Sequence, residues 1–384
     1  MTERVLFAEP AHVAVLRRMH LIRQWDRSPL NRRIVIAIVV AWAPLVAVNL
    51  VRVVVYHDDA GLTFFQDIGV NARLLLAVPL LIAGEYIILP QLETLIGYFR
   101  ASVVMHEDAA KFDAILDRAR RRNAAIWPSA IMFLGAYTIV LTQLLFASHV
   151  HLPAWRLSST THFSPAGWWH ALVGLPLLLG LIFAWLWRIA IWALFLRAVA
   201  RLRLRLVSAH PDGAAGLQFL AYSPRPFVPI ALAIGIVVAG GMANNVLYFG
   251  VSPLEHGLVP AVTAALVTLI IICPPLVFTR VLMDEWRAGI LKYDELSRNV
   301  GRTFEHKWFN APVRGDEAPL GEPDFSATTD LYSIVADVHA MRVFVFDYKS
   351  VVVIAGATLL PFAPIWLSAV PLDKMLHTIS SLLL

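Results

Sequence analysis

Charged residues are scarce in this chain of 384 residues, and their scarcity argues against an ordinary soluble domain. They make up 15% of the sequence, whereas hydrophobic residues make up 58%. In soluble domains about a quarter of the residues are charged. A spanning helix needs about 20 apolar residues, because the hydrocarbon core of a bilayer is about 30 Å thick. The composition therefore predicts an integral membrane protein.

Cysteine and recognisable catalytic motifs are also nearly absent. The single cysteine, Cys273, lies in an apolar run, so an intramolecular disulfide is excluded. The sequence contains no His-Glu-x-x-His zinc motif and no nucleotide-binding glycine loop. We therefore predict no catalytic residue, no cofactor and no metal site. His149 and His151 form a His-x-His pair, the one pattern that could instead bind zinc or copper.

Seven apolar stretches, each long enough to cross a bilayer, run from Ile34 to Val370. We place the spans at 34–56, 71–95, 124–147, 169–196, 227–250, 258–280 and 347–370. The predicted fold class is all-α, a polytopic membrane helical bundle of about seven transmembrane helices. The seven-span domain, 34–370, lies between an amphipathic N-terminal segment, 1–33, and an interfacial C-terminal tail, 371–384.

Basic residues collect on one side of these spans. Of the 32 Lys and Arg residues, 27 lie in the N-terminal segment and the second, fourth and sixth connections, and only Arg156 and Lys374 lie on the other side. Because basic loops stay in the cytoplasm, the N-terminus is predicted to be cytoplasmic and the C-terminus external. The same rule explains the net charge of +5, so we expect anionic lipid at the cytoplasmic face, and no nucleic acid, as partner.

Two cytoplasmic connections have helical periodicity and predict a helical layer under the membrane. Residues 96–122 extend the second span. Within 281–346, residues 281–308 extend the sixth span, and a helix that restarts at Thr328 runs into the seventh. The stretch Ala311–Ser326 is rich in Pro, Gly and acidic residues, which predicts a mobile loop.

Glu85 is the most pointed single residue, because it interrupts the otherwise apolar run Leu75–Pro90. A carboxylate at that depth costs several kcal/mol unless it is protonated, paired or hydrated. It marks either an ion or proton pathway or a structural ion pair, and Arg188 in the fourth span is the candidate partner. Arg188 could instead extend its charge to the cytoplasmic surface.

The fifth span combines small residues with two adjacent amides. Small side chains recur every four positions from Ala231 to Ala243, a spacing that lets another helix approach closely. Asn244 and Asn245 follow near the outer end and need polar partners in an apolar span. Two alternatives remain open, helix packing or a pore that uses the amide oxygens.

Adjacent prolines interrupt the sixth span. Pro274 and Pro275 each remove a backbone N–H donor and can bend a helix. A bend exposes carbonyl groups that can line a cavity or bind cations. The pair is therefore the candidate hinge or gate, although proline is also common in membrane helices.

A glycine-rich turn between the fourth and fifth spans, 210–216, follows a basic amphipathic segment, 197–207. An ordinary turn explains much of it, with His210 ending a helix and Pro211 stopping it. Alternatively, glycine N–H groups bind an anion or a lipid headgroup beside the arginines. The candidate headgroup residues are His210, Asp212, Gly213, Gly216, Arg201, Arg203 and Arg205.

The segment His210–Leu220 and the closing run Leu359–Asp373 resemble a set of uncharacterised bacterial multi-pass membrane proteins. In those proteins a cytoplasmic His-Pro-Asp turn is followed by Gly-Gly-Leu and an apolar span. This chain has Ala215-Gly216 where they have Gly-Gly. The resemblance implies a bacterial inner membrane and carries over no activity.

Three classes of function remain open. The leading hypothesis is an ion channel or transporter, with a homo-oligomer as one form, in which Glu85 passes a cation or proton. The asparagines would contribute oxygens and the proline pair would permit gating. The alternatives are a membrane-embedded enzyme or lipid-handling protein that uses His210 and Asp212 at the cytoplasmic interface, and a noncatalytic scaffold or sensor that uses the cytoplasmic helices.

Overall fold

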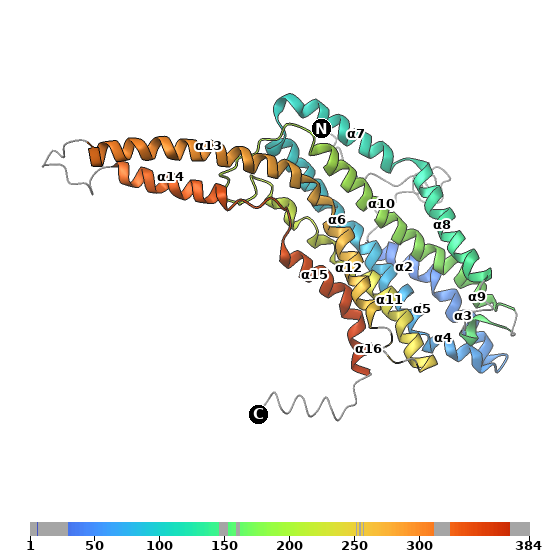
Figure 1. Cartoon of the computed structure of the whole chain (residues 1–384). Coiled ribbons are helices and arrows are strands. Elements are labelled where there is room, and N and C mark those ends of the chain that lie inside the picture. The colour runs from blue at the N-terminus through green and yellow to red at the C-terminus, as the bar shows by residue number, and fades with distance from the viewer. Residues whose placement is uncertain are drawn as a thin grey trace, which may run out of the picture.

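The fold is an all-α membrane bundle, as predicted (Figure 1). The computed structural model describes residues 6, 30–145, 153–158, 162–250, 252, 255, 257–310 and 323–368. Among these residues six helices are long and apolar enough to span a membrane, and a bent pair at 258–309 supplies a seventh if it crosses as one. Predictions for the N-terminal segment before Leu30, the His149–His151 pair, residues 311–322 and the tail 371–384 fall outside the described residues.

The spanning helices lie close to their predicted positions. They are α2 (Leu30–Ala41) with α3 (Ala43–Val54), α5 (Ile68–Ala72) with α6 (Val78–Tyr98), α8 (Ile126–Leu145), α9 (Pro165–Trp169) with α10 (Leu175–Val199), α11 (Val228–Phe249), α12 (Leu258–Ile272), and α15 (Tyr348–Leu359) with α16 (Ala363–Ser368). Apolar runs form helices here because hydrocarbon offers no partner for a backbone N–H or C=O group. The second span contains two π-helical turns, Arg73–Ala77 and Phe99–Val103, and the fourth contains one, His170–Gly174.

The bundle has two unlike ends. At the hairpin end, α13 (Thr279–Glu305) and α14 (Pro323–His339) pack side by side and leave the bundle as a long helical hairpin (Figure 1). At the opposite end, which we call the cap end, the short connections 55–67 and 153–158 cover the helix ends. The sequence predicts that the hairpin end is cytoplasmic, and the orientation in the membrane stays a prediction.

The predicted proline hinge lies where the sixth span bends. α12 ends at Ile272 and α13 begins at Thr279, and the two helical stretches are bent by 47°. Pro274 and Pro275 are both buried in the short turn that joins them. The bend follows from the missing N–H donors. Movement about this bend remains a prediction.

Two predictions about the hairpin end are wrong. The second span does not extend to residue 122, because its helix stops at Val103 and α7 (Ala109–Asn123) packs against α10. Nor does α14 run on into α15. The Arg342 N–H donates to the Gly213 carbonyl at 2.8 Å instead of continuing a helix. Asp347 then starts α15 by accepting the Ser350 N–H at 2.9 Å.

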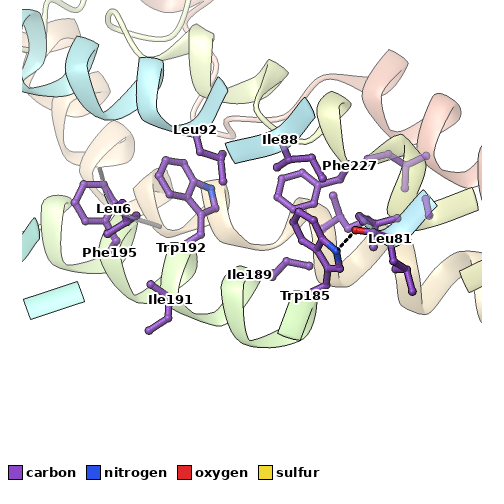
Figure 2. Close-up of a cluster of buried hydrophobic side chains, with 14 of the residues drawn as sticks. Leu6, Leu81, Ile88, Leu92, Trp185, Ile189, Ile191, Trp192, Phe195 and Phe227 are labelled. Atoms are coloured by element: carbon purple, nitrogen blue, oxygen red, sulfur yellow. Dashed lines mark hydrogen bonds between the residues drawn. The ribbon is translucent and has the colours of Figure 1, made fainter. Parts of the chain in front are cut away.

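Buried aromatic side chains fill the bundle between α6 and α10 (Figure 2). Trp185 and Trp192 of α10 are each 2% exposed. The indole Nε1–H of Trp185 donates to the Leu81 carbonyl at 2.9 Å. A tryptophan buried in this way needs a partner for its N–H, so this hydrogen bond sets how the two helices meet.

The small residues of α11 pack helices closely, one of the two alternatives that the sequence left open. A Cβ added to Gly235 would lie 2.3 Å from the Thr358 carbonyl oxygen of α15. A Cβ added to Gly240 would lie 3.0 Å from Gly69 Cα of α5. α11 therefore touches both neighbours at backbone distance, as small residues allow in membrane bundles.

Candidate functional site

Glu85 lies between two arginines inside the bundle. Arg188 Nη2 donates to Glu85 Oε1 at 2.6 Å, so the predicted pairing is present. Arg33 Nη2 of α2 lies 2.5 Å from Glu85 Oε2. The side chains of Arg33, Glu85 and Arg188 are only 10%, 15% and 8% exposed. We call these three residues the triad.

Within the triad one carboxylate faces two guanidinium groups. The Arg188 guanidinium lies over the Trp185 ring, 4.9 Å from its centroid. Its Nη1 is buried and has no hydrogen-bond partner within the described part of the chain. Charges interact strongly where water is excluded. A cation approaching Glu85 would be repelled, whereas an anion beside Arg188 would be attracted.

A second charged group lies at the cap end, around Asp67, a residue that sequence analysis missed. Asp67 follows α4 (Leu62–Gln66) and caps α5 by accepting the Val70 N–H at 2.9 Å. Trp155 Nε1 donates to it at 2.9 Å and Asn244 Nδ2 at 2.8 Å. The carboxylate is fully buried, and all three donors are neutral. The groups in direct contact with the Asp67 carboxylate therefore donate hydrogen bonds to it but do not neutralise its charge.

Asn244 joins α11 to the start of the second span. Besides donating to Asp67, it accepts the Gly69 N–H through Oδ1 at 3.1 Å. A Cβ on Gly69 would lie 2.7 Å from Asn244 Nδ2, so only glycine fits this approach. Asn244 is thus a packing residue. Asn245, predicted beside it, makes no side-chain hydrogen bond in the part of the chain that the structure describes.

Two arginines and a histidine lie near Asp67 without an ion pair to it among the described residues. Arg73 Nε lies 3.4 Å from the Val237 carbonyl oxygen. The Arg156 guanidinium lies 5.1 Å from the centroid of the Trp155 ring, and His170 stacks on that ring at 5.7 Å. Both arginines interact electrostatically with Asp67. We call Asp67, Arg73, Arg156 and His170 the cap-end cluster.

A small cavity lies beside Arg156 and His170. Its volume is about 30 Å³, which is room for one water molecule or one small anion. Arg156 Nε and His170 Nδ1 are both buried and have no hydrogen-bond partner among the described residues. Burial lowers the pKa of Arg156 to about 10, so the group is still cationic at neutral pH. The site therefore suits an anion.

Two members of the cap-end cluster begin π-helical turns. Arg73 begins the turn 73–77 of the second span, and His170 begins the turn 170–174 of the fourth. Single π-helical turns inside α-helices are uncommon and occur frequently at functional sites. Gly174 completes the second turn and leaves space for the imidazole, since a Cβ there would lie 3.3 Å from His170 Nδ1.

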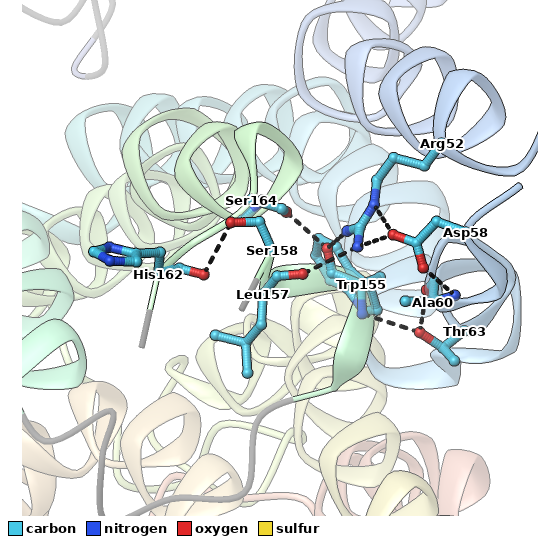
Figure 3. Close-up of polar contacts among 10 residues, drawn as sticks. Arg52, Asp58, Ala60, Thr63, Trp155, Leu157, Ser158, His162 and Ser164 are labelled. Atoms are coloured by element: carbon cyan, nitrogen blue, oxygen red, sulfur yellow. Dashed lines mark hydrogen bonds and ion pairs between the residues drawn. The ribbon is translucent and has the colours of Figure 1, made fainter. Parts of the chain in front are cut away.

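Arg52 holds the cap over this cluster (Figure 3). Its guanidinium pairs with Asp58 at 2.5 Å and donates to the carbonyls of Trp155 and Leu157 at 2.9 and 3.1 Å. The hydrogen bonds from Arg52 hold the pKa of Asp58 below its ordinary value. Two connections far apart in the sequence are thereby joined, and the joined cap covers Asp67.

Apolar side chains separate the triad from the cap-end cluster. Val78 and Leu81 lie between Arg73 and Glu85 on the second span, and both are fully buried. Trp185 covers them from α10 and is 2% exposed. The residues between the two charged groups on the second span are therefore apolar and buried.

The glycine-rich turn is built around Asp212. Its carboxylate accepts the N–H groups of Ala214, Gly216 and Gln218 at 2.8, 3.1 and 3.0 Å. Burial raises the pKa of Asp212, but these hydrogen bonds more than offset it, and the pKa lies below its ordinary value. The Gly213 N–H donates to the His210 carbonyl at 3.0 Å. Because both glycine donors serve the turn, the proposed anion site at these N–H groups is not formed.

The basic segment before this turn is extended, so the prediction that His210 ends a helix is wrong. α10 ends at Val199, and Leu204 pairs with Val104 in an isolated antiparallel bridge. The alternating leucines pack against the core. The alternating arginines are exposed, namely Arg201, Arg203 and Arg205.

Comparison of the chain with family models, curated proteins and solved structures finds no match. The fold and the site therefore define the class of protein: a polytopic α-helical membrane protein with two buried charged groups. Among the described residues, no group of three His, Cys, Asp or Glu side chains could hold a metal ion.

Proposed function

We propose that this protein moves a small inorganic anion across the membrane. The observation that carries the proposal is the excess of buried positive charge in the cap-end cluster, where one carboxylate accompanies two guanidinium groups. Buried nitrogens of Arg188, Arg156 and His170 also lack partners among the described residues. Ionisable side chains within membrane spans are costly and commonly mark substrate or ion pathways.

The same charges argue against the cation or proton pathway that the sequence suggested. Both oxygens of Glu85 accept hydrogen bonds from arginines, so a cation would have to displace one of them. It would also be repelled by the guanidinium groups at short range in a poorly hydrated site. An anion would instead meet a guanidinium N–H, a strong charge-assisted donor.

Two anion-attracting groups on either side of an apolar barrier suit a transporter that opens to one side at a time. The barrier contains Leu81 and Trp185, and the cap held by Arg52 covers the other cluster. The bend at Pro274–Pro275 and the π-helical turn at Arg73–Ala77 are places at which helices can rearrange. We assign them that role as part of the proposal.

Ion flux through the purified protein in liposomes tests the proposal. We expect chloride or nitrate efflux above that of empty liposomes, and no potassium efflux under the same gradient. Arg188→Gln removes a charged donor whose hydrogen bonds contribute about 1.5–3 kcal/mol, so flux should fall at least about tenfold. Arg201→Gln changes an exposed arginine at the hairpin end and should leave flux unchanged.

Glu85→Gln separates the anion pathway from a cation pathway. If an anion is carried, this variant loses less flux than Arg188→Gln, because the Arg188 guanidinium that binds the anion is still present. If a cation or proton is carried, Glu85→Gln is the more damaging change. Two results would overturn the proposal. One is potassium flux through the protein, and the other is the absence of flux of any ion when the protein has its native thermal stability.

One observation favours a second function, that of a membrane scaffold. The hairpin of α13 and α14 extends away from the bundle (Figure 1). Leu291 of α13 is 72% exposed, and Phe309, in the turn His306–Asn310 after α13, is 77% exposed. Apolar side chains exposed outside the membrane suit contact with a partner protein. Leu291→Ser with Phe309→Ser should then abolish co-purification of a defined partner without changing anion flux. Unchanged co-purification would remove this candidate.

A further inference from the structure

A cavity of about 590 Å³ opens at the hairpin end, outside the triad and the cap-end cluster. Its walls come from the approach to α11, the link 341–347 and the first residues of α15. Small-molecule sites span about 300–1,000 Å³, so the cavity has the size of a ligand site. No sequence motif indicated it, because its walls meet only in three dimensions.

The cavity walls carry excess positive charge. Arg225 Nη2 lies 2.6 Å from Asp347 Oδ2, and this carboxylate oxygen also accepts the Ser350 N–H and hydroxyl, each at 2.9 Å. The single acid in the walls is therefore engaged. Within the described chain, no carboxylate pairs with Arg342 or Lys349. The N-terminus of α15, at Tyr348, adds the positive end of a helix dipole.

Aromatic side chains line the same cavity and remain open to solvent. The exposed fractions are 45% for Tyr222, 54% for Phe344, 45% for Phe346 and 65% for Tyr348. The Arg225 guanidinium lies 4.6 Å from the centroid of the Tyr222 ring. Aromatic rings beside cations are characteristic of the boundary between headgroups and acyl chains. In plain water, exposed phenylalanines on one surface would be unfavourable.

The cavity also lies where two spans begin. The apolar stretches Gln218–Tyr248 and Tyr348–Leu367 both start in its walls. A ligand bound there would sit at headgroup depth, with the surfaces of α11 and α15 below it. That position favours a phosphate that belongs to a lipid over a phosphate free in solution.

The Asp212 turn supports one wall of the cavity. The Gly213 carbonyl accepts the Arg342 N–H at 2.8 Å, which holds the link 341–347 against the turn. Gly213 has a φ of +66°, and a Cβ there would lie 3.6 Å from Arg342 Nη2. The turn, held together by the half-buried Asp212 carboxylate, thus supports Arg342 in the cavity wall.

We propose that this cavity binds the phosphate headgroup of an anionic phospholipid, with Arg342 and Lys349 as the cations that face it. The site is independent of anion transport, because none of its residues belongs to the triad or the cap-end cluster. It differs from general attraction to a charged membrane, which any exposed arginine at this end would supply.

Lipid binding by the full-length protein in detergent tests the proposal. The probes are short-chain phosphatidylglycerol and phosphatidylcholine, with bound lipid counted by native mass spectrometry. We expect preferential retention of phosphatidylglycerol. A charged hydrogen bond to the phosphate contributes at least about a tenfold change in affinity, so Arg342→Gln with Lys349→Gln should weaken phosphatidylglycerol binding at least about tenfold. Arg201→Gln with Arg205→Gln is the matched control and should change it less than twofold.

Three outcomes would overturn the proposal. The first is equal retention of the two lipids by the unchanged protein. The second is an equal loss in both double variants, which would mean general surface attraction. The third is displacement of phosphatidylglycerol by millimolar inorganic phosphate, with the same dependence on Arg342 and Lys349, which would make free phosphate the ligand. Thermal unfolding of each variant checks that the fold is retained.

Discussion

The triad and the cap-end cluster each contain one carboxylate and two guanidinium groups but hold their carboxylates in opposite ways. Glu85 meets two guanidinium groups directly, at 2.5 and 2.6 Å. Asp67 meets only neutral N–H donors, at 2.8 to 2.9 Å, while its arginines act from further away. In the triad each charge therefore stabilises its partners. In the cap-end cluster the carboxylate joins three separate parts of the chain and leaves the arginines available to a ligand.

The largest effect that this comparison predicts is that of Glu85→Ala. The change leaves Arg188 buried without a counter-ion in the described part of the chain, and breaking a buried pair in this way costs about 3–5 kcal/mol. Unfolding in mixed micelles should detect the loss. Arg33→Gln should cost less, because Glu85 keeps Arg188. A loss below about 1 kcal/mol for Glu85→Ala would show that water screens the arginines.

Asp67→Asn should have an intermediate effect. The amide keeps the shape, but its NH2 group would face one of the N–H donors that Asp67 now accepts. Leaving one buried polar group unsatisfied costs about 1–3 kcal/mol. Unfolding in the same micelles gives the free energy, and Trp155 fluorescence reports the lost contact. A larger loss of unfolding free energy than that of Glu85→Ala would reverse the comparison, because Asp67 would then contribute more to stability than Glu85.

Gly240→Ala should have a smaller effect, and it tests how closely the helices at the cap end approach. The new Cβ would lie 3.0 Å from Gly69 Cα, so one backbone must shift, at a cost of about 1 kcal/mol. Gly180→Ala is the matched control in α10, where no atom lies within 4 Å of the added Cβ. It should be neutral or slightly stabilising in the same unfolding measurement. Equal effects would mean that the cap end tolerates looser packing.

The spans and the Glu85–Arg188 ion pair could be predicted from the sequence, because the position of a residue along an apolar helix gives its depth in the membrane. Glu85 and Arg188 lie at similar depth from their helix ends, so their pairing was predictable. Arg33 was missed because the N-terminal segment was taken to end at residue 33, whereas α2 begins at Leu30. Asp67 was missed because it lies just before the predicted second span. Its contact with Asn244 depends on tertiary packing that no periodicity encodes.

One missed feature did have a sequence signal. Arginine and leucine alternate strictly from Arg201 to Leu206, and alternation with a period of two indicates an extended segment and not a helix. The segment is extended, and Leu204 bridges Val104. The cavity at the hairpin end had no such signal, because Arg342 lies in a break between α14 and α15, and the sequence analysis assigned this region to one continuous helix.

The smallest predicted effect concerns pH and extends the comparison to a carboxylate outside the spans. Asp347 resembles Glu85 in meeting a guanidinium directly, and the hydrogen bond from Arg225 lowers its pKa from 3.8 to about 2. Because the folded pKa is the lower one, the stabilisation is fully present above about pH 4 and disappears as the pH falls towards 2. Thermal unfolding between pH 5 and pH 2 should show this step, within the larger acid response of the whole protein.

The variant Asp347→Asn should remove the step. The control Asp330→Asn, on an exposed part of α14, should retain it. If both variants kept the same acid profile, the Arg225–Asp347 pair would contribute nothing to folding, and only buried pairs such as that of Glu85 would do so.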